Sequence, residues 1–272
     1  MPLRIANVPT DRIGVDWRGV TPEALRDKSL AAVQRTLIRR GKREIKVGEL
    51  FRITGSPADM RWELEGDFSA VHHIGAGLTA GEIVVEGSVG RHAGAGMRGG
   101  RLEIRGDAGD HLGAEMRGGV IRVRGNAANH VGAAYPGSRH RMSGGMILID
   151  GDAGSELGLR MRRGLIAVGG SAGPYLGLRM LAGSIFVFGA CGEHPGAAMR
   201  RGTIGLFGNV RPTLLPTFRA GYLGPLPVLH LLEKHLHDEG FAVPRLRNLT
   251  GAIELFHGDL LEGGRGEIVA AG

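Results

Sequence analysis

Short stretches in which apolar and polar residues alternate recur through the middle of the chain. Each stretch has two apolar positions separated by one residue, and a glycine precedes it. The paired positions are Ile83/Val85, Leu102/Ile104, Ile121/Val123, Ile147/Ile149, Ile166/Val168, Ile185/Val187 and Ile204/Leu206. An apolar period of two with many β-branched residues is typical of a half-buried β-strand. The pattern therefore predicts seven such strands.

These strands belong to a repeat whose usual length is 19 residues. Its units begin at Gly66, Gly87, Gly106, Gly125, Gly151, Gly170 and Gly189, and the last closes at Gly208. The first unit is two residues longer, and the fourth carries seven extra residues, Tyr135 to Arg141. A second apolar column precedes the strands: Leu78, Met97, Met116, Met142, Met161, Met180 and Met199. A fixed period of this length is the signature of a repeat architecture.

Two further glycine columns run through every unit without a break. One is Gly75, Gly94, Gly113, Gly132, Gly158, Gly177 and Gly196, and the other is Gly81, Gly100, Gly119, Gly145, Gly164, Gly183 and Gly202. Glycine at a fixed corner indicates a backbone with positive φ or a close approach between chains. A helical repeat is disfavoured, since each helical glycine would cost about 1 kcal/mol.

We therefore predict an all-β fold, a right-handed parallel β-helix (solenoid) of about seven 19-residue coils. Equivalent residues would stack about 4.8 Å apart, which is the spacing of neighbouring strands. The right-handed sense is expected because parallel crossover connections almost always have it.

The ends of such a stack need caps, because an open coil exposes unpaired backbone. We expect residues 1–65 to form an N-terminal cap, 66–208 the repeats, and 209–272 a helical C-terminal cap or docking extension.

Within the N-terminal cap, the pattern predicts a helix around Pro22–Arg39 and strands near Ile45–Val47 and Phe51–Ile53. Within the extension, an amphipathic helix should follow Pro225 and end near Gly240.

Charge and composition narrow the choice of partners. The chain has 49 glycines, only 5% aromatic residues and a net charge of +7, carried mostly by arginine. Arginine suits bidentate contact with carboxylate or phosphate. An acidic ligand, an acidic protein surface and nucleic acid are all compatible with this balance.

Several of the arginines are predicted to line up beside the methionine column. We name the following eight the arginine stripe and take them as the candidate ligand- or partner-binding residues: Arg98, Arg117, Arg160, Arg162, Arg163, Arg179, Arg200 and Arg201. Stacked like charges repel one another unless they are neutralised, and a coil does not need them. Alternatively, the arginines bind nothing and form a solvent-exposed corner of the repeat, with acidic residues such as Glu115 between them.

A second polar column holds His73, His92, His111 and His130, continued by Glu156, Tyr175 and His194. Zinc ligands must converge tetrahedrally, whereas side chains stacked in parallel do not. We therefore expect stacked imidazoles rather than a metal site, and the role of this histidine ladder stays open.

The sequence offers no catalytic signature. It contains no P-loop, HExxH motif or nucleophile elbow, and the single cysteine, Cys191, excludes an internal disulfide or a cysteine-based metal cluster held by this chain alone. Asp259 and Glu262 are one candidate for a C-terminal site, but surface turn residues are the favoured interpretation. The N-terminus lacks an apolar signal region and no segment is long enough to span a bilayer, so we expect a cytoplasmic protein without membrane contact.

The glycines that open the units follow the pattern G-x-x-G-x-x-x-G, for example Gly87, Gly90 and Gly94, with a departure at Ala128 in the fourth unit. This pattern over residues 66–208 resembles the GXGXG β-helix superfamily. That superfamily includes the C-terminal domain of the glutamate synthase large subunit and the C-subunit of formylmethanofuran dehydrogenase. The free-standing length and the C-terminal extension look most like this C-subunit, in particular its bacterial counterpart in the formyltransferase/hydrolase complex.

The resemblance implies a non-catalytic accessory subunit. Its partners would be the amidohydrolase-type A-subunit, the B-subunit and the formyltransferase D-subunit of the same complex, with no nucleic acid. The complex would transfer formyl from formyl-tetrahydromethanopterin to a methanofuran-like carrier and hydrolyse it to formate. The chain alone would bind no cofactor, and a polyglutamyl carrier arm could meet the arginine stripe within the complex.

Three other interpretations remain. The chain could be the C-subunit of a redox-active tungsten or molybdenum formylmethanofuran dehydrogenase, or a stand-alone glutamate synthase-type domain. A left-handed solenoid acyltransferase is disfavoured, since those enzymes have six-residue units.

Overall fold

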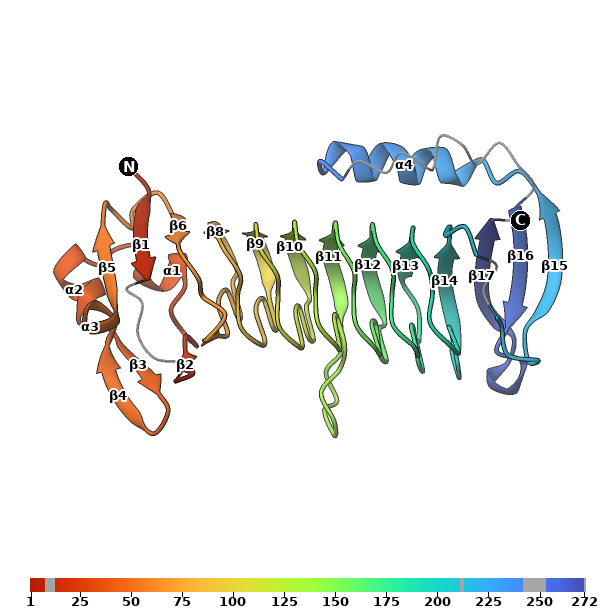
Figure 1. The fold of residues 1–272 in the computed structure, drawn as a ribbon, viewed down its shortest axis with the longest axis horizontal. Helices are drawn as coiled ribbons and strands as arrows, with labels where there is room; N and C mark the ends of the chain where they lie inside the picture. The colour runs from red at the N-terminus through yellow and green to blue at the C-terminus, as the bar shows by residue number, and fades with distance from the viewer. Residues whose placement is uncertain (8–12, 211–212, 242–252, 272) are drawn as a thin grey trace.

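The chain forms one long, largely parallel β-sheet with few helices. The computed structural model describes residues 1–7, 13–210, 213–241 and 253–271. The sheet has 13 strands (Figure 1). Its order is β15 (Arg219–Gly224), β16 (Ile253–Gly258), β17 (Arg265–Ala271), β14 (Arg201–Leu206), β13 (Ser184–Val187), β12 (Arg163–Val168), β11 (Ser143–Ile149), β10 (Gly118–Val123), β9 (Arg98–Ile104), β8 (Glu82–Glu86), β6 (Arg61–Glu65), β1 (Leu3–Asn7) and β5 (Phe51–Thr54).

The strands from β8 to β14 carry the seven predicted alternating stretches, and each pairs in parallel with the next. Ile83 lies opposite Leu102, and Leu102 lies opposite Ile121. A second set of parallel bridges joins the units at another corner, through Phe68, Val89, Ala108, Ala127, Ala153, Ala172 and Cys191. The units are therefore hydrogen-bonded to their neighbours at more than one place around their circumference, and Figure 1 shows them stacked along one axis.

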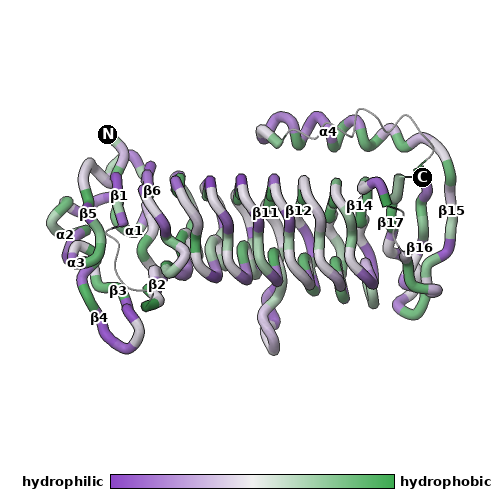
Figure 2. The backbone as a smooth tube through the Cα atoms, in the orientation of Figure 1, coloured by the Kyte–Doolittle hydropathy of each residue, from purple (hydrophilic) through white to green (hydrophobic). Residues whose placement is uncertain are grey.

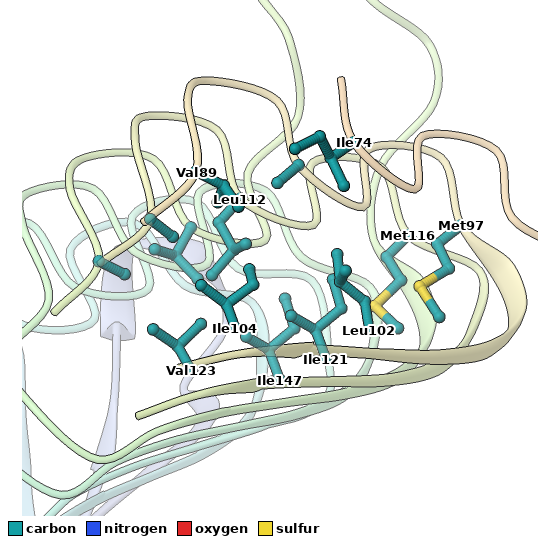
Figure 3. Close-up of a cluster of buried hydrophobic side chains, with 14 of the residues drawn as sticks. Ile74, Val89, Met97, Leu102, Ile104, Leu112, Met116, Ile121, Val123 and Ile147 are labelled. Carbon is teal, nitrogen blue, oxygen red and sulfur yellow. The ribbon is translucent and has the colours of Figure 1, made fainter. Parts of the chain in front are cut away.

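The core runs lengthwise between the strands and the opposite corners of the units. The paired apolar positions of the strands are buried, as is the entire Leu78/Met column. Figure 3 shows Met97 and Met116 side by side, next to the row formed by Leu102, Ile121 and Ile147. Each apolar residue thus packs on its equivalent one unit away, which makes the predicted columns continuous.

The two unbroken glycine columns have the backbone conformation that the sequence predicted. Every glycine in both columns has positive φ. In one column the corner is also crowded, because a Cβ on Gly119 would lie 2.7 Å from the carbonyl oxygens of Gly99 and Gly100. Only glycine satisfies both demands.

The N-terminal region differs from the expected single helix over Pro22–Arg39. It contains α1 (Pro22–Leu25), α2 (Leu30–Gln34) and then β3 (Leu37–Arg40). Ser29 caps α2 by accepting a hydrogen bond from Ala32 N. The expectation was wrong because this cap starts a new helix inside the predicted one, and β3 pairs with other strands instead of extending α2.

The two strands predicted in this region correspond to β4 (Arg43–Lys46) and β5, although Val47 begins a helix, and β1, β2 (Val15–Asp16) and β6 were not predicted. A four-stranded sheet is formed, in order, by β4, β3, β2 and β7 (Val71–His72). Between β4 and β5 lies α3 (Val47–Leu50). The ring of Phe51 packs edge-on against Trp17 and is stacked on Phe68, which joins this region to the first repeat unit.

The C-terminal region contains the expected helix, α4 (Val228–Asp238), but it is not only helical. Strand β15 precedes the helix, while β16, a 3-10 turn named η2 (Leu260–Glu262) and β17 follow it. Strand β17 pairs in parallel with β14, so Ile268 continues the column of Ile204. The Arg-Gly-x-Ile pattern at Arg265–Ile268 copies that at Arg201–Ile204. Sequence analysis missed this signal because the two segments lie far apart along the chain.

Helix α4 runs along the long axis of the stack, across the direction of the strands in its C-terminal half (Figure 1), and carries both polar and apolar residues (Figure 2). Leu236 and the adjoining Phe241 pack in a second apolar cluster on the outer face of the sheet, with Leu148, Phe186 and Phe207 among its members.

Two arginines from earlier strands reach the end of α4. Arg101 forms an ion pair with Glu239 at 3.1 Å. Arg122, whose side chain is almost fully buried, pairs with Asp150, donates to Gly240 O and lies over the Phe241 ring. These contacts attach α4 to β9 and β10.

The crowding at the glycine corners yields a direct test. Gly119→Ala places a methyl against backbone oxygens, whereas Gly96→Ala changes a glycine of similar positive φ with open space around it. We expect Gly96→Ala to lower the free energy of unfolding by about 1–2 kcal/mol, and Gly119→Ala to lower it by about 1–3 kcal/mol more. Urea unfolding followed by circular dichroism measures both, and equal losses would contradict the close-approach explanation.

Candidate functional site

The arginine stripe begins in a column of residues that follows the buried methionines. In successive units this column holds Arg98, Arg117, Ser143, Arg162, Leu181 and Arg200. The backbone N–H of each residue donates a hydrogen bond to a backbone carbonyl of the preceding unit. The four arginines are exposed. The structure therefore aligns them as predicted, with interruptions at Ser143 and Leu181, while Arg163 and Arg201 are exposed and begin β12 and β14.

Arg160 and Arg179 come from a different column, on the other side of the methionines. The backbone N–H groups of this column donate to a carbonyl of the following unit, and its earlier members are Gly77, Gly96, Glu115 and Ala134. Gly77 and Gly96 have positive φ, and so do Arg160 (58°) and Arg179 (54°). A left-handed conformation costs an L-residue other than glycine about 1–2 kcal/mol. Two arginines thus stand where glycine would be more stable.

The two columns converge on a cleft of about 370 Å³. We name it the arginine cleft, and it is lined by Arg141, Arg160, Arg179, Leu181, Ala198, Arg200 and Glu262. Four guanidinium groups therefore surround one carboxylate. Glu262 Oε2 lies 2.9 Å from Arg200 Nε, and no carboxylate of the described residues lies within ion-pair distance of Arg141, Arg160 or Arg179. The cleft has an excess of positive charge.

Arg141 belongs to the seven-residue insertion, Tyr135–Arg141, which we name the finger. It projects beside β11, away from the row of strands (Figure 1). Arg160 Nη1 donates to Ser138 O at 3.5 Å, and Arg117 Nη2 lies 3.3 Å from His140 Nδ1. The Nε of Arg141 is buried with no hydrogen-bond partner among the described residues. The finger thus adds a further arginine to the cleft, with a buried Nε that has no partner among the described residues.

The structure brings together only part of the predicted stripe. Arg160, Arg179 and Arg200 line the cleft, whereas Arg98, Arg117, Arg162, Arg163 and Arg201 are not among its lining residues. Arg141 was not predicted to belong to the site, and Glu262 was predicted to be a surface turn residue. Glu262 does end the turn η2, but it also pairs with Arg200. For Arg141, the departure of its unit from the 19-residue length was the available signal.

The histidine ladder forms a stack of rings, as the sequence predicted. Ring centroids are 4.7 Å apart from His73 to His92, 5.1 Å from His92 to His111, and 4.7 Å from His111 to His130, with nearly parallel planes. All four residues have positive φ, a conformation in which histidine is enriched. The Tyr135 ring of the finger lies against His92 and His111, and its hydroxyl is 2.8 Å from His92 Nδ1.

The two ends of the ladder are bounded by carboxylates. His73 Nδ1 lies 3.1 Å from Asp16, which also pairs with Arg18, and His130 Nδ1 lies 3.4 Å from Glu156. These contacts hold the stack between the N-terminal region and the fifth unit.

Burial disfavours the protonated form of three of the stacked imidazoles, those of His73, His92 and His111. It lowers the pKa of His73 and His111, and burial together with the neighbouring imidazoles lowers the pKa of His92 to about 4. Burial likewise raises the pKa of the Tyr135 hydroxyl to about 12. Within the described ranges, no group of three or more His, Cys, Asp or Glu side chains could hold a metal ion. The cleft, with its four arginines and one glutamate, is therefore the more strongly charged of the two sites.

Known proteins with a similar sequence and structure identify the family of this chain. No protein-family model matches it. The structure superposes with a TM-score of 0.87 on a chain of the formyltransferase/hydrolase complex (FhcABCD) from Methylorubrum extorquens, crystallised in complex with methylofuran. The two chains are 34% identical, and the match covers 99% of each. The chain belongs to the C-subunit family of formyltransferase/hydrolase complexes and formylmethanofuran dehydrogenases.

Curated members of the C-subunit family are more distant. The C-subunit of the tungsten-containing formylmethanofuran dehydrogenase 2 is 34% identical over 74 residues in Methanothermobacter thermautotrophicus and 35% identical over 74 residues in Methanothermobacter marburgensis. These matches cover 26% of this chain and 27% of each relative, so they span about a quarter of those proteins. Among the described residues of the present chain, no helix is long and apolar enough to cross a membrane.

The lowered pKa of His92 predicts that the protein loses stability in acid. Because the pKa of folded His92 (about 4) lies below the ordinary value of 6.5, the unfolded chain binds a proton more readily than the folded chain. The free energy of unfolding should therefore be greatest above pH 6.5 and fall as the pH drops toward 4. Urea unfolding at pH 7, 6, 5 and 4.5 measures this slope.

The variant His92→Asn removes the titrating group, and asparagine also tolerates positive φ. Its slope should be shallower than that of the wild type, whereas His230→Asn in helix α4, outside the ladder, should keep the wild-type slope. Identical slopes for His92→Asn and the wild type would show that the ladder does not cause the acid sensitivity.

Proposed function

We propose that the chain is the accessory C-subunit of a formyltransferase/hydrolase complex of one-carbon metabolism. In this role it performs no chemistry itself. It supports subunits that transfer formyl from formyl-tetrahydromethanopterin to a methanofuran-like carrier and hydrolyse the product to formate. The observation that carries the proposal is the 99% mutual coverage, at 34% identity, with a chain of the formyltransferase/hydrolase complex.

The architecture supports a scaffold role. The parallel strands, the second set of bridges and the 19-residue register agree with a right-handed parallel β-helix of seven coils. We assign residues 1–65 to an N-terminal cap, 66–208 to the β-helix and 209–272 to a C-terminal docking extension. A stack whose neighbouring units are linked by backbone hydrogen bonds offers long, rigid faces on which several subunits can be held in fixed positions.

The arginine stripe is the part of this scaffold that we assign to contact. Its members Arg98, Arg117, Arg162 and Arg200 are exposed in one column, and the arginine cleft holds more positive than negative groups. Arginine pairs bidentately with carboxylates. The stripe therefore suits either an acidic face of the amidohydrolase-type A-subunit, the B-subunit or the formyltransferase D-subunit, or the acidic arm of the carrier. Methylofuran is present in the crystallised Methylorubrum complex, which favours a carrier of this kind.

A redox-active dehydrogenase is the second candidate, because the curated relatives are C-subunits of tungsten-containing enzymes. Those matches span about a quarter of each protein, whereas the match to the formyltransferase/hydrolase complex covers nearly the whole of both chains. The hydrolytic complex is therefore favoured over the dehydrogenase and over a stand-alone glutamate synthase-type domain.

The decisive experiment is to purify the tagged chain from its native host at low salt and to identify the co-purifying chains by mass spectrometry. Amidohydrolase-type and formyltransferase chains without a metal-pterin protein would support the proposal. A molybdenum- or tungsten-binding chain would favour the dehydrogenase, and a flavin-binding or glutaminase chain would favour glutamate synthesis.

Removing charge from the stripe should weaken its contacts. We expect replacement of Arg98, Arg117, Arg162 and Arg200 by glutamine to lower the affinity of the assembled complex for its acidic carrier and to flatten the salt dependence of binding, since fewer screened ion pairs remain. Isothermal titration at low and at physiological salt measures both effects. An unchanged affinity in an intact assembly would exclude the carrier contact.

A further inference from the structure

The hairpin formed by β3 and β4 concentrates positive charge at the N-terminal end of the stack. We name residues 35–46 the basic hairpin. In a chain whose net charge is +7, it holds one acid, Glu44, and six basic residues: Arg35, Arg39, Arg40, Lys42, Arg43 and Lys46. Figure 1 shows β3 and β4 projecting from the N-terminal region, whereas the residues that line the arginine cleft belong to later units. The basic hairpin is therefore a second cationic feature, separate from the cleft.

The charges of the basic hairpin are not balanced within the chain. Five of its cations are exposed and have no carboxylate of the described residues within ion-pair distance: Arg35, Arg39, Lys42, Arg43 and Lys46. In the strand register, Arg40 lies directly opposite Arg43. Like charges in directly opposed positions destabilise a sheet. The hairpin thus keeps an arrangement that lowers stability, and an anionic surface placed against it would offset that loss.

The backbone of the basic hairpin is hydrogen-bonded in a fixed position, unlike that of a charged tail. Its strands are joined by Gly41 and Lys42, and Gly41 has a φ of 56°, as the first central position of a tight hairpin turn requires. The N–H of Gly41 donates to Gly14 O at 3.1 Å, and the N–H of Val47 donates to Thr36 O at 2.9 Å. Strand β3 also pairs with β2. The cations are therefore pre-organised, which reduces the entropy lost when a partner binds.

One face of the basic hairpin combines charge with an apolar residue. Successive residues of a strand face opposite sides, and Ile38 is only 4% exposed, whereas Leu37 is 57% exposed. Arg39 shares the outward face with Leu37, and Lys46 lies directly opposite Leu37. Leu37 is thus flanked by cations of both strands. An apolar centre with a polar rim is the usual anatomy of a protein–protein interface, whereas a nucleic acid or a lipid headgroup needs only the charge.

We propose that the basic hairpin docks into an acidic groove of a folded partner subunit, with Leu37 at the centre of the contact. Because the hairpin projects from the stack (Figure 1), its shape suits a groove better than a flat surface. The sign of its charge requires Asp and Glu side chains on the partner. This inference goes beyond the proposed function, which assigns partner contact to the arginine stripe, and it rests on that function only for the presence of partner subunits.

Cross-linking identifies the occupant. The variant Lys42→p-benzoylphenylalanine is produced as the tagged full-length chain in its native host, irradiated in the purified assembly, and the cross-linked peptide is sequenced by mass spectrometry. We expect a peptide rich in Asp and Glu from a different protein chain. A cross-link to nucleic acid, to lipid, to a second copy of this chain or to a basic segment would overturn the proposal. The absence of any cross-link in an assembly that contains its partner chains would overturn it as well.

Charge and apolar contact are then tested separately by the recovery of the cross-linked partner with each tagged variant. Arg39→Gln/Lys42→Gln/Arg43→Gln should lower this recovery at least about fivefold at physiological salt and weaken its dependence on salt concentration, because fewer screened charges remain. Leu37→Ser should lower it by about threefold or more with the wild-type salt dependence, because an apolar side chain is lost from the contact. Unchanged recovery in either variant would contradict the proposed interface.

The matched control is Arg26→Gln/Lys28→Gln/Arg52→Gln. These residues are exposed in the same N-terminal region and carry the same total charge, but they lie outside the basic hairpin. Recovery of the partner should stay within about twofold of the wild-type value, since isolated surface charges contribute little. A loss equal to that of the hairpin variant would show that overall charge, and not the hairpin, recruits the partner. Circular dichroism verifies that every variant folds.

The outcomes also separate this inference from the proposed function. An assembly that contains formyltransferase chains, and in which both hairpin variants behave as the wild type, refutes only the hairpin contact. A cross-link to an acidic segment of a metal-pterin or glutaminase chain supports the hairpin contact and refutes the proposed function.

Discussion

The structure depends on the backbone of each repeat unit following that of its neighbour closely enough for main-chain groups to hydrogen bond between them. That demand fixes the corners, since the two unbroken glycine columns all adopt positive φ and several of their members lie against carbonyls of the preceding unit. It also fixes the side chains, because equivalent residues must stack in columns. The chemistry of the molecule is thus set column by column, and each column must be compatible with contact between like groups.

Two polar columns meet this demand in different ways. In the histidine ladder, burial lowers the pKa of His73, His92 and His111, which reduces the repulsion between rings stacked 4.7–5.1 Å apart. Arginine does not lose its charge in proteins, so the arginine stripe can be relieved only by distance, solvent or an anion. Interruptions at Ser143 and Leu181 and the pairing of Arg200 with Glu262 provide part of that relief.

Features that follow from the period could be predicted, and those that lie outside it could not. The strand alternation, the methionine core and the stacking of His73, His92, His111 and His130 all follow from the 19-residue spacing, because the spacing places equivalent residues together. The expected helix over Pro22–Arg39 failed where no period operates, and the cap at Ser29 decided the outcome. The arginine cleft shows the same division. Arg160, Arg179 and Arg200 could be placed near one another from the repeat alone. Arg141 comes from an insertion and Glu262 from a turn after β16. Tertiary contacts set the positions of both segments, and the repeat spacing does not encode those contacts.

Helix α4 has a consequence for how the molecule comes apart. A stack whose units touch only their neighbours unfolds piecemeal, with its ends fraying first. Here α4 begins after β15, at one end of the stack, and is tied to Arg101 and Arg122 in the middle of the row of strands. Opening the C-terminal units therefore requires breaking contacts with β9 and β10 as well. Because the helix links distant units, we expect this half of the stack to unfold cooperatively, as a globular domain does.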